Sequence, residues 1–210
     1  MLNLNKIRET MPNLFKGGSF YKNEFGLRVL LDDTDLSPYC FYNSIHKAKE
    51  SILSVFDSTE LYLIKVYRLN NEIDPEILLK SLKEKDNDNQ PIDYIEHFVQ
   101  PYEKFEEDFE DGEGVYGLYI LYKVELTSKL IVDLLWDPLA VGFQGSLAFD
   151  LENPYDIYFL NLAGTISFHP YDHRGADILC ENIEAYRYIF HKLKNNLFEH
   201  DLDLMQKRLN

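Results

Sequence analysis

The sequence predicts an α+β fold, a single domain in which a mostly antiparallel sheet has helices packed on one side. Two runs, ELYLIKVYRL at 60–69 and VYGLYILYKVEL at 115–126, are almost continuously apolar and rich in β-branched and aromatic residues, as buried strands are. A third apolar run at 156–162 is joined by a short Ala-Gly connection to the alternating stretch 165–169, which is typical of a hairpin. Between these strands apolar residues recur at helical spacing, so we expect helices to cover the sheet.

The first part of the chain shows only a weak pattern of apolar and polar residues. Residues 1–43 are loosely patterned and contain a short predicted strand at 27–31. A helix is then predicted to begin at Asn43 or Ser44, because either side chain can cap a helix and the residues after it are apolar at helical spacing.

A stronger start signal for a helix is Asp74-Pro75. The aspartate can accept from the unpaired amides of the first turn, and the proline stands where a missing amide costs nothing. This helix is expected to reach about Lys83, followed by a polar loop at 83–91 and a strand at 92–99.

The second half of the chain adds the remaining elements. Thr127 or Ser128 can cap a helix that Pro138 is expected to end. A short strand or helix entry is predicted at 177–180, followed by an amphipathic helix from Ile183 and a short helix in the tail. No repeat or linker interrupts the pattern, so residues 1–210 are expected to form one domain.

The charge of the chain limits the partners it would attract. Its 210 residues carry a formal net charge of −15, and 45% of them are hydrophobic, which is enough for a substantial core. Nucleic acid and anionic membranes are polyanions and would be repelled, whereas a basic protein would be attracted. The two isolated cysteines, the lack of a signal-like N-terminus and the lack of a long apolar run lead us to expect a cytoplasmic protein.

Residues 101–114, PYEKFEEDFEDGEG, are expected to form an acidic loop in which carboxylates alternate with aromatic rings. One interpretation is a solvated segment, because such dense carboxylates repel one another. The other is a contact surface for a basic partner, in which the charges speed encounter and the rings act as anchors. The candidate partner-binding residues are Phe105, Glu106, Glu107, Asp108, Phe109, Glu110 and Asp111.

The stretch FHPYDHRGAD at 168–177 concentrates polar and turn-forming residues. In the structural interpretation Asp172 caps its own turn, Gly175 adopts a positive φ, and Arg174 forms a fork onto Asp172 or Asp177. The residues of this motif, to which we assign a structural or binding role, are His169, Tyr171, Asp172, Arg174, Gly175 and Asp177.

Metal binding and catalysis are less favoured for the same stretch. His169 is expected to leave a strand just before Pro170. The positive charge of Arg174 next to His173 would repel a divalent metal ion. The chain lacks phosphate-binding glycine loops, a nucleophile elbow and paired cysteines for zinc. We therefore assign no catalytic residue, no metal and no cofactor from the sequence.

The C-terminal half contains a recognisable pattern made of Phe159-Leu160-Asn161-Leu162, Phe168-His169, Tyr171, Asp172, Arg174, Gly175 and Asp177. With these residues it resembles an uncharacterised bacterial family, domain of unknown function 3885. His173 stands where the family pattern has a second aspartate, and the resemblance extends from about Ile45 to the end of the chain. It implies the fold but no chemistry. Small acidic bacterial domains of this kind resemble immunity proteins encoded beside secreted toxins.

These observations lead to two functional hypotheses. The favoured one is a non-enzymatic, cytoplasmic protein-binding protein, specifically an immunity-type inhibitor that covers a basic toxin with its acidic surface. The alternative is a small hydrolase or phosphate-ligand enzyme, in which Arg174 holds an anion and a histidine transfers protons. Its site would consist of His169, Asp172, His173, Arg174 and Asp177. An enzyme requires the motif to line a pocket, and an inhibitor does not.

Overall fold

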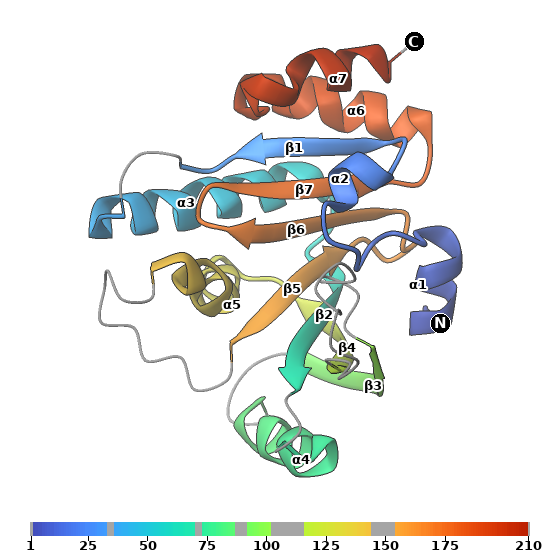
Figure 1. Ribbon diagram of the computed structural model, residues 1–210, viewed down its shortest axis with the longest axis vertical. Coiled ribbons are helices and arrows are strands. Elements are labelled where there is room, and N and C mark those ends of the chain that lie inside the picture. The colour runs from blue at the N-terminus through green and yellow to red at the C-terminus, as the bar shows by residue number, and fades with distance from the viewer. Residues whose placement is uncertain are drawn as a thin grey trace, which may run out of the picture.

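The protein is a single α+β domain built on one antiparallel sheet. The computed structural model describes residues 2–32, 36–69, 73–86, 92–101, 116–143 and 154–209. Within these ranges seven strands form a sheet in the order β1-β7-β6-β5-β2-β4-β3 (Figure 1), and each pair is antiparallel. The strands are β1 Gly26–Leu30, β2 Glu60–Leu69, β3 Ile92–Pro101, β4 Tyr116–Glu125, β5 Tyr155–Leu160, β6 Ile166–Asp172 and β7 Gly175–Cys180. The predicted fold class is confirmed.

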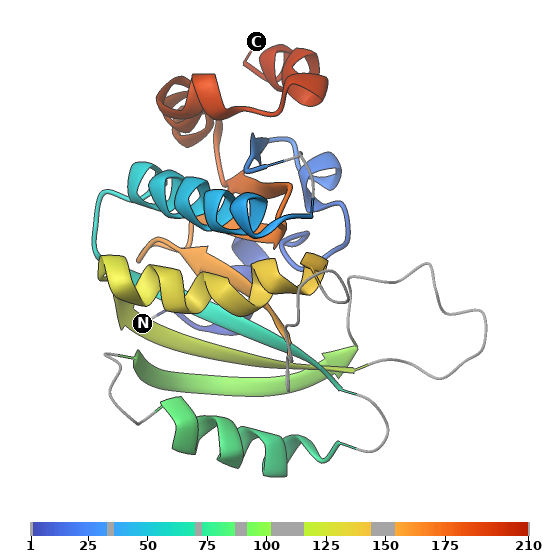
Figure 2. The ribbon, with the colours of Figure 1, turned by 90° about the vertical axis from the view of Figure 1, so that its left-hand side faces the viewer.

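The longer helices gather on one face of this sheet. They are α3 Pro38–Val55, α4 Pro75–Asp86, α5 Ser128–Ala140 and α6 Ile183–Leu193. Apolar residues from all four belong to the same core cluster, and Figure 2 shows α3 and α5 running side by side across the sheet. The shorter helices are α1 Leu4–Thr10, α2 Ser19–Lys22 and α7 Leu202–Lys207. No helix in the described ranges is long and apolar enough to cross a membrane.

The opposite face of the sheet is covered by the N-terminal segment. Along β2, Leu61 and Leu63 face the long helices, whereas Tyr62 and Ile64 join a second cluster with residues of the first fifteen positions. Ile7 of α1 is fully buried in that second cluster. A central strand covered on both faces has no polar side, which explains why β2 reads as a continuous apolar run.

Two helix boundaries differ from those predicted. Helix α3 begins at Pro38 and not near Asn43, because Ser37 caps it by accepting from the Cys40 amide. Helix α5 continues through Pro138 to Ala140. The proline removes the hydrogen bond that Leu134 would accept four residues earlier, and that carbonyl accepts from the Tyr155 hydroxyl at 3.3 Å.

The C-terminal segment meets the sheet at its β1 edge. Leu197 forms an isolated bridge with Val29, and the amide of Phe198 donates to the carbonyl of Arg28 at 2.9 Å. The backbone groups of this edge strand are thereby paired by the C-terminal segment. Helix α2 contacts β1 and β7, so α2 and the C-terminal segment both lie beside the hairpin formed by β6 and β7.

Candidate ligand-binding site

The motif FHPYDHRGAD forms the β6–β7 hairpin and the turn between the two strands. Strand β6 runs through His169 and Pro170 as far as Asp172, so the expectation that His169 leaves the strand before the proline is wrong. The pairing of β6 with β7 shifts register between Pro170 and Asp172. A β-bulge is one of the few places where a strand accepts proline, because no ladder amide is needed there.

The turn is held by a pair of residues within the motif. Asp172 accepts from the amide of Arg174 at 2.8 Å, and the Arg174 guanidinium donates to the same carboxylate at 2.6 and 3.0 Å. Asp172 therefore caps its own turn, and the fork of Arg174 falls on Asp172 rather than on Asp177. The charge and hydrogen bond of Asp172 raise the pKa of Arg174 above its ordinary value.

Gly175 serves close packing rather than a positive φ. Among the described residues the positive-φ glycines are Gly18 and Gly164, so the prediction for Gly175 is wrong. A Cβ at this position would lie 2.2 Å from the Tyr171 hydroxyl oxygen and 2.9 Å from the Val29 carbonyl oxygen. Glycine is needed because β1 and the Tyr171 ring approach the backbone too closely for any side chain.

The side chains of the motif point to opposite faces of the hairpin. His169, Tyr171 and Asp177 lie on the side of the N-terminal segment and line a pocket. His173 turns to the helical side, where its ring centroid lies 4.6 Å from that of Phe143. The five-residue catalytic arrangement considered from the sequence is therefore not brought together.

Asp177 organises the centre of the site. One carboxylate oxygen accepts from Nε of Arg28 at 2.9 Å, and the other accepts from the hydroxyl of Ser19 at 3.2 Å and the amide of Phe20 at 3.3 Å. Because this single carboxylate reaches β1 and the first turn of α2, it fixes the N-terminal segment beside the hairpin. Asp177 itself is buried.

Arg28 is committed to this network. Its guanidinium also donates to Asp201 at 3.3 Å and lies over the rings of Phe20, Tyr21 and Tyr171, 4.7 to 5.3 Å from their centroids. Burial opposes the charge, but the hydrogen bond and the charge of Asp177 outweigh it and raise the pKa of Arg28. Arg28 therefore remains a cation inside the protein.

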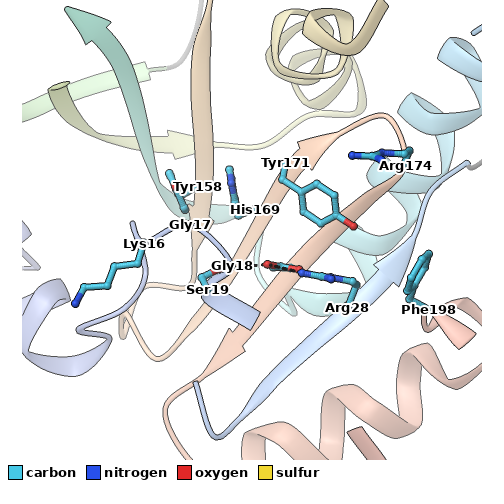
Figure 3. A pocket seen from close by; sticks show the side chains of 11 residues that line it. Lys16, Gly17, Gly18, Ser19, Arg28, Tyr158, His169, Tyr171, Arg174 and Phe198 are labelled. Carbon is cyan, nitrogen blue, oxygen red and sulfur yellow. Dashed lines mark hydrogen bonds and ion pairs between the residues drawn. The ribbon is translucent and has the colours of Figure 1, made fainter. Parts of the chain in front are cut away.

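The hairpin, the N-terminal segment and the C-terminal segment border a cavity of about 360 Å³ that is open to solvent on one side. Figure 3 shows Tyr158 and His169 at one end, Phe198 at the other, and Arg28, the partner of Asp177, between them. The described residues that line the cavity are Lys16, Gly17, Gly18, Ser19, Arg28, Tyr158, His169, Tyr171, Arg174, Asp177 and Phe198.

The buried ring of His169 is held in one orientation. Its Nδ1 donates to the carbonyl oxygen of Ile157 at 2.9 Å, and the ring stacks on Tyr158 with centroids 4.1 Å apart. A carbonyl oxygen only accepts, so the proton of the neutral ring resides on Nδ1 and Nε2 carries the lone pair. Tyr171 provides a neutral hydroxyl, because burial raises the pKa of its phenol.

The lining of the cavity has an excess of positive charge. Three cationic side chains contribute to it, from Lys16, Arg28 and Arg174, against the one carboxylate of Asp177 among the described lining residues. Arg28 is paired with Asp177, and Arg174 lies at the exposed rim with Asp172. Lys16 has no ion pair with any residue that the structure describes, so its charge is available to a ligand.

Further predictions concern the acidic segment, the cysteines and metal binding. The acidic candidates Phe105, Glu106, Glu107, Asp108, Phe109, Glu110 and Asp111 lie outside the described residues. Both cysteines are free and buried, and burial raises the pKa of the Cys180 thiol to about 12. In the described part of the chain, no three His, Cys, Asp or Glu residues are arranged to hold a metal ion.

Half of the pocket was missed by reasoning from sequence. Lys16, Ser19 and Arg28 come from the loosely patterned N-terminal segment, and Phe198 comes from the tail. The one available signal was Arg28, a single cation within a short apolar strand. Arg28 pairs directly with Asp177 in the register of β1 and β7, but that pairing joins strands about 150 residues apart and has no local signature.

A family model described as Domain of unknown function (DUF3885) matches residues 4–201. The chain belongs to this family. The match begins well before Ile45, so membership of DUF3885 covers the N-terminal segment that lines the pocket as well as the hairpin. No curated protein and no solved structure is similar enough to count as a match.

Proposed function

We propose that this member of DUF3885 is a non-enzymatic binding protein whose hairpin pocket holds the anionic group of a small ligand. The observation that carries the proposal is the positive lining of the cavity in a chain with a net charge of −15. An anion that meets this protein is repelled by most of its surface, so the pocket is where it gains cationic partners. Lys16 and Arg174 supply charge at the rim, and Tyr171 supplies a hydroxyl group.

The arrangement supports binding rather than the hydrolase alternative. Asp172 and Asp177 each hold a guanidinium group, so neither carboxylate is placed to accept a proton from a substrate. His173 is on the other side of the hairpin, which leaves His169 as the only histidine among the described lining residues. The part of the alternative hypothesis that the geometry favours is therefore the phosphate-type ligand and not the reaction.

The test is the binding of inorganic phosphate, measured by calorimetry, to the wild-type chain and to two matched variants. Lys16→Gln removes the pocket cation, and Lys80→Gln removes an exposed lysine of α4 as a control. We expect Lys16→Gln to weaken binding and Lys80→Gln to leave it unchanged. Absence of phosphate binding, or equal effects of the two substitutions, would contradict the proposal.

A second candidate function rests on the acidic segment of residues 101–114. Its interleaved carboxylates and rings fit a basic protein partner such as a toxin, which an immunity-type protein would cover in the cytoplasm. Reversing the charges of Glu106, Glu107, Asp108 and Glu110 should slow association with such a partner and flatten its salt dependence. Affinity capture from the native host, washed at increasing salt, tests whether one basic protein is retained. Association of the charge-reversed chain at the wild-type rate would exclude this surface.

A further inference from the structure

The size of the cavity shows that a simple anion would leave most of it unfilled. About 360 Å³ is within the range of sites that enclose whole organic ligands, roughly 300–1,000 Å³. The cationic side chains at the rim are Lys16 and Arg174, which stand on opposite sides of the pocket in Figure 3. The remaining space must be complementary to another part of the ligand.

That remaining space is bordered by aromatic rings. The stacked pair of Tyr158 and His169 is buried at one end, and Phe198 stands at the other end, beyond Arg28 (Figure 3). Ring faces and edges of this kind favour a flat aromatic group, which gains dispersion and stacking energy that an aliphatic group of equal size does not.

The centre of the cavity also provides hydrogen bonding of both kinds. The Arg28 guanidinium and the Asp177 carboxylate are engaged with each other and with neighbouring residues, which fixes the floor on which a ligand would lie. The Tyr171 hydroxyl can donate or accept a hydrogen bond. A heterocyclic ring or a sugar, which presents donors and acceptors on one edge, matches such a surface better than a hydrocarbon ring does.

From these features we infer that the ligand of the pocket is a phosphate monoester that carries an aromatic ring, of the class of the nucleoside monophosphates. The inference rests on the proposed function, because it assigns the phosphate to the cationic rim and adds the ring between Tyr158 and Phe198. The phosphate and the ring then contribute independently to affinity, and each contribution can be removed separately by substitution.

The experiment compares three probes: adenosine monophosphate, phenyl phosphate and inorganic phosphate. We expect the two ring-bearing probes to bind about tenfold more tightly than inorganic phosphate, with adenosine monophosphate the tighter of the two. Phe198→Ala should weaken the binding of adenosine monophosphate by about fivefold or more and leave the binding of inorganic phosphate unchanged. Tyr39→Ala, at a tyrosine of α3 that is 74% exposed, is the control and should change neither.

The outcomes separate the two proposals. If all three probes bind with equal affinity and Lys16→Gln weakens each of them, the ring assignment is overturned and the anion pocket stands. If Phe198→Ala weakens inorganic phosphate as much as adenosine monophosphate, the ring assignment is also overturned, because the effect is then on the pocket as a whole. If no probe binds, or if Lys16→Gln does not change the affinity for any probe, the proposed function fails and the inference fails with it.

Discussion

At the scale of single residues, the hairpin motif is mostly devoted to holding its own geometry. Asp172 caps the turn, Gly175 allows β1 and Tyr171 to approach, and Asp177 anchors the N-terminal segment. Three of the six residues to which the sequence assigned a structural or binding role therefore maintain the shape of the site. His169 and Tyr171 present their side chains to the cavity itself.

Gly175→Ala should destabilise the protein by about 1–3 kcal/mol, the usual cost of overpacking. The new methyl group would lie 2.2 Å from the Tyr171 hydroxyl oxygen and 2.8 Å from its Cζ. Urea unfolding measures the loss, and the matched background is Tyr171→Leu, which removes both atoms. We expect the alanine to cost less in that background, and an equal cost in both backgrounds would show that Tyr171 is not what excludes a side chain.

His173 should make stability depend on pH. Burial lowers the pKa of this histidine below its ordinary value of 6.5, and its Nδ1 has no hydrogen-bond partner among the described residues. The unfolded chain then binds the proton more readily than the folded one. The stability contributed by neutral His173 is complete above pH 6.5 and is lost as the pH falls below it.

His173→Phe tests this dependence, because it keeps a ring against Phe143 and removes the titrating group. The free energy of unfolding of the wild-type chain should fall more steeply than that of the variant between pH 7 and the lowered pKa. The measurement is urea unfolding at a series of pH values. Parallel curves for the two chains would contradict the assignment.

At the scale of elements, the site depends on how β1 and α2 are attached to the hairpin. Asp177 and Arg28 are nearly inaccessible, with side-chain exposures of 5% and 14%. Removal of one partner from a buried ion pair leaves the other charge uncompensated, which costs far more than the pair contributes when both are present.

Asp177→Asn should therefore lower the free energy of unfolding by about 3 kcal/mol. The matched control is Asp172→Asn, which also breaks an arginine pair of the same hairpin. Because Arg174 is 62% exposed, that loss should be below about 1 kcal/mol. Denaturant titration compares the two variants, and losses of equal size would show that Asp177 does not anchor β1 and α2.

The elements also show what the sequence can and cannot predict. The strand at 60–69 and the helix start at Asp74-Pro75 were correct to the residue, since each has a strong local signal. The start of α3 was misplaced because Ser37-Pro38 precedes the apolar periodicity that marks the helix. The pocket was predicted only in its hairpin part, because the rest arrives through the pairing of β1 with β7 and the docking of α2 and the C-terminal segment.

At the scale of the whole molecule, the N-terminal segment has two tasks. Its apolar residues cover the second face of the sheet, and the stretch that follows them supplies Lys16, Gly17, Gly18 and Ser19 to the cavity. Helix α1 is fixed at its start, where Glu96 accepts from the amide of Leu4 at 2.6 Å. One segment therefore contributes both to the cover of the core and to the lining of the pocket, and undocking it should affect both.

Ile7→Lys tests this coupling, with Glu9→Lys as the control on the same helix. Ile7 is fully buried against the sheet, whereas Glu9 is exposed, so the same new side chain meets opposite surroundings. A lysine at position 7 would place an unpaired charge in an apolar layer, which is relieved only by release of α1. We expect Ile7→Lys to increase binding of a hydrophobic dye, to speed amide exchange in β2 and to abolish phosphate binding together, while Glu9→Lys changes none of these. Retention of phosphate binding in a chain whose second sheet face is exposed would show that the pocket forms without the N-terminal layer.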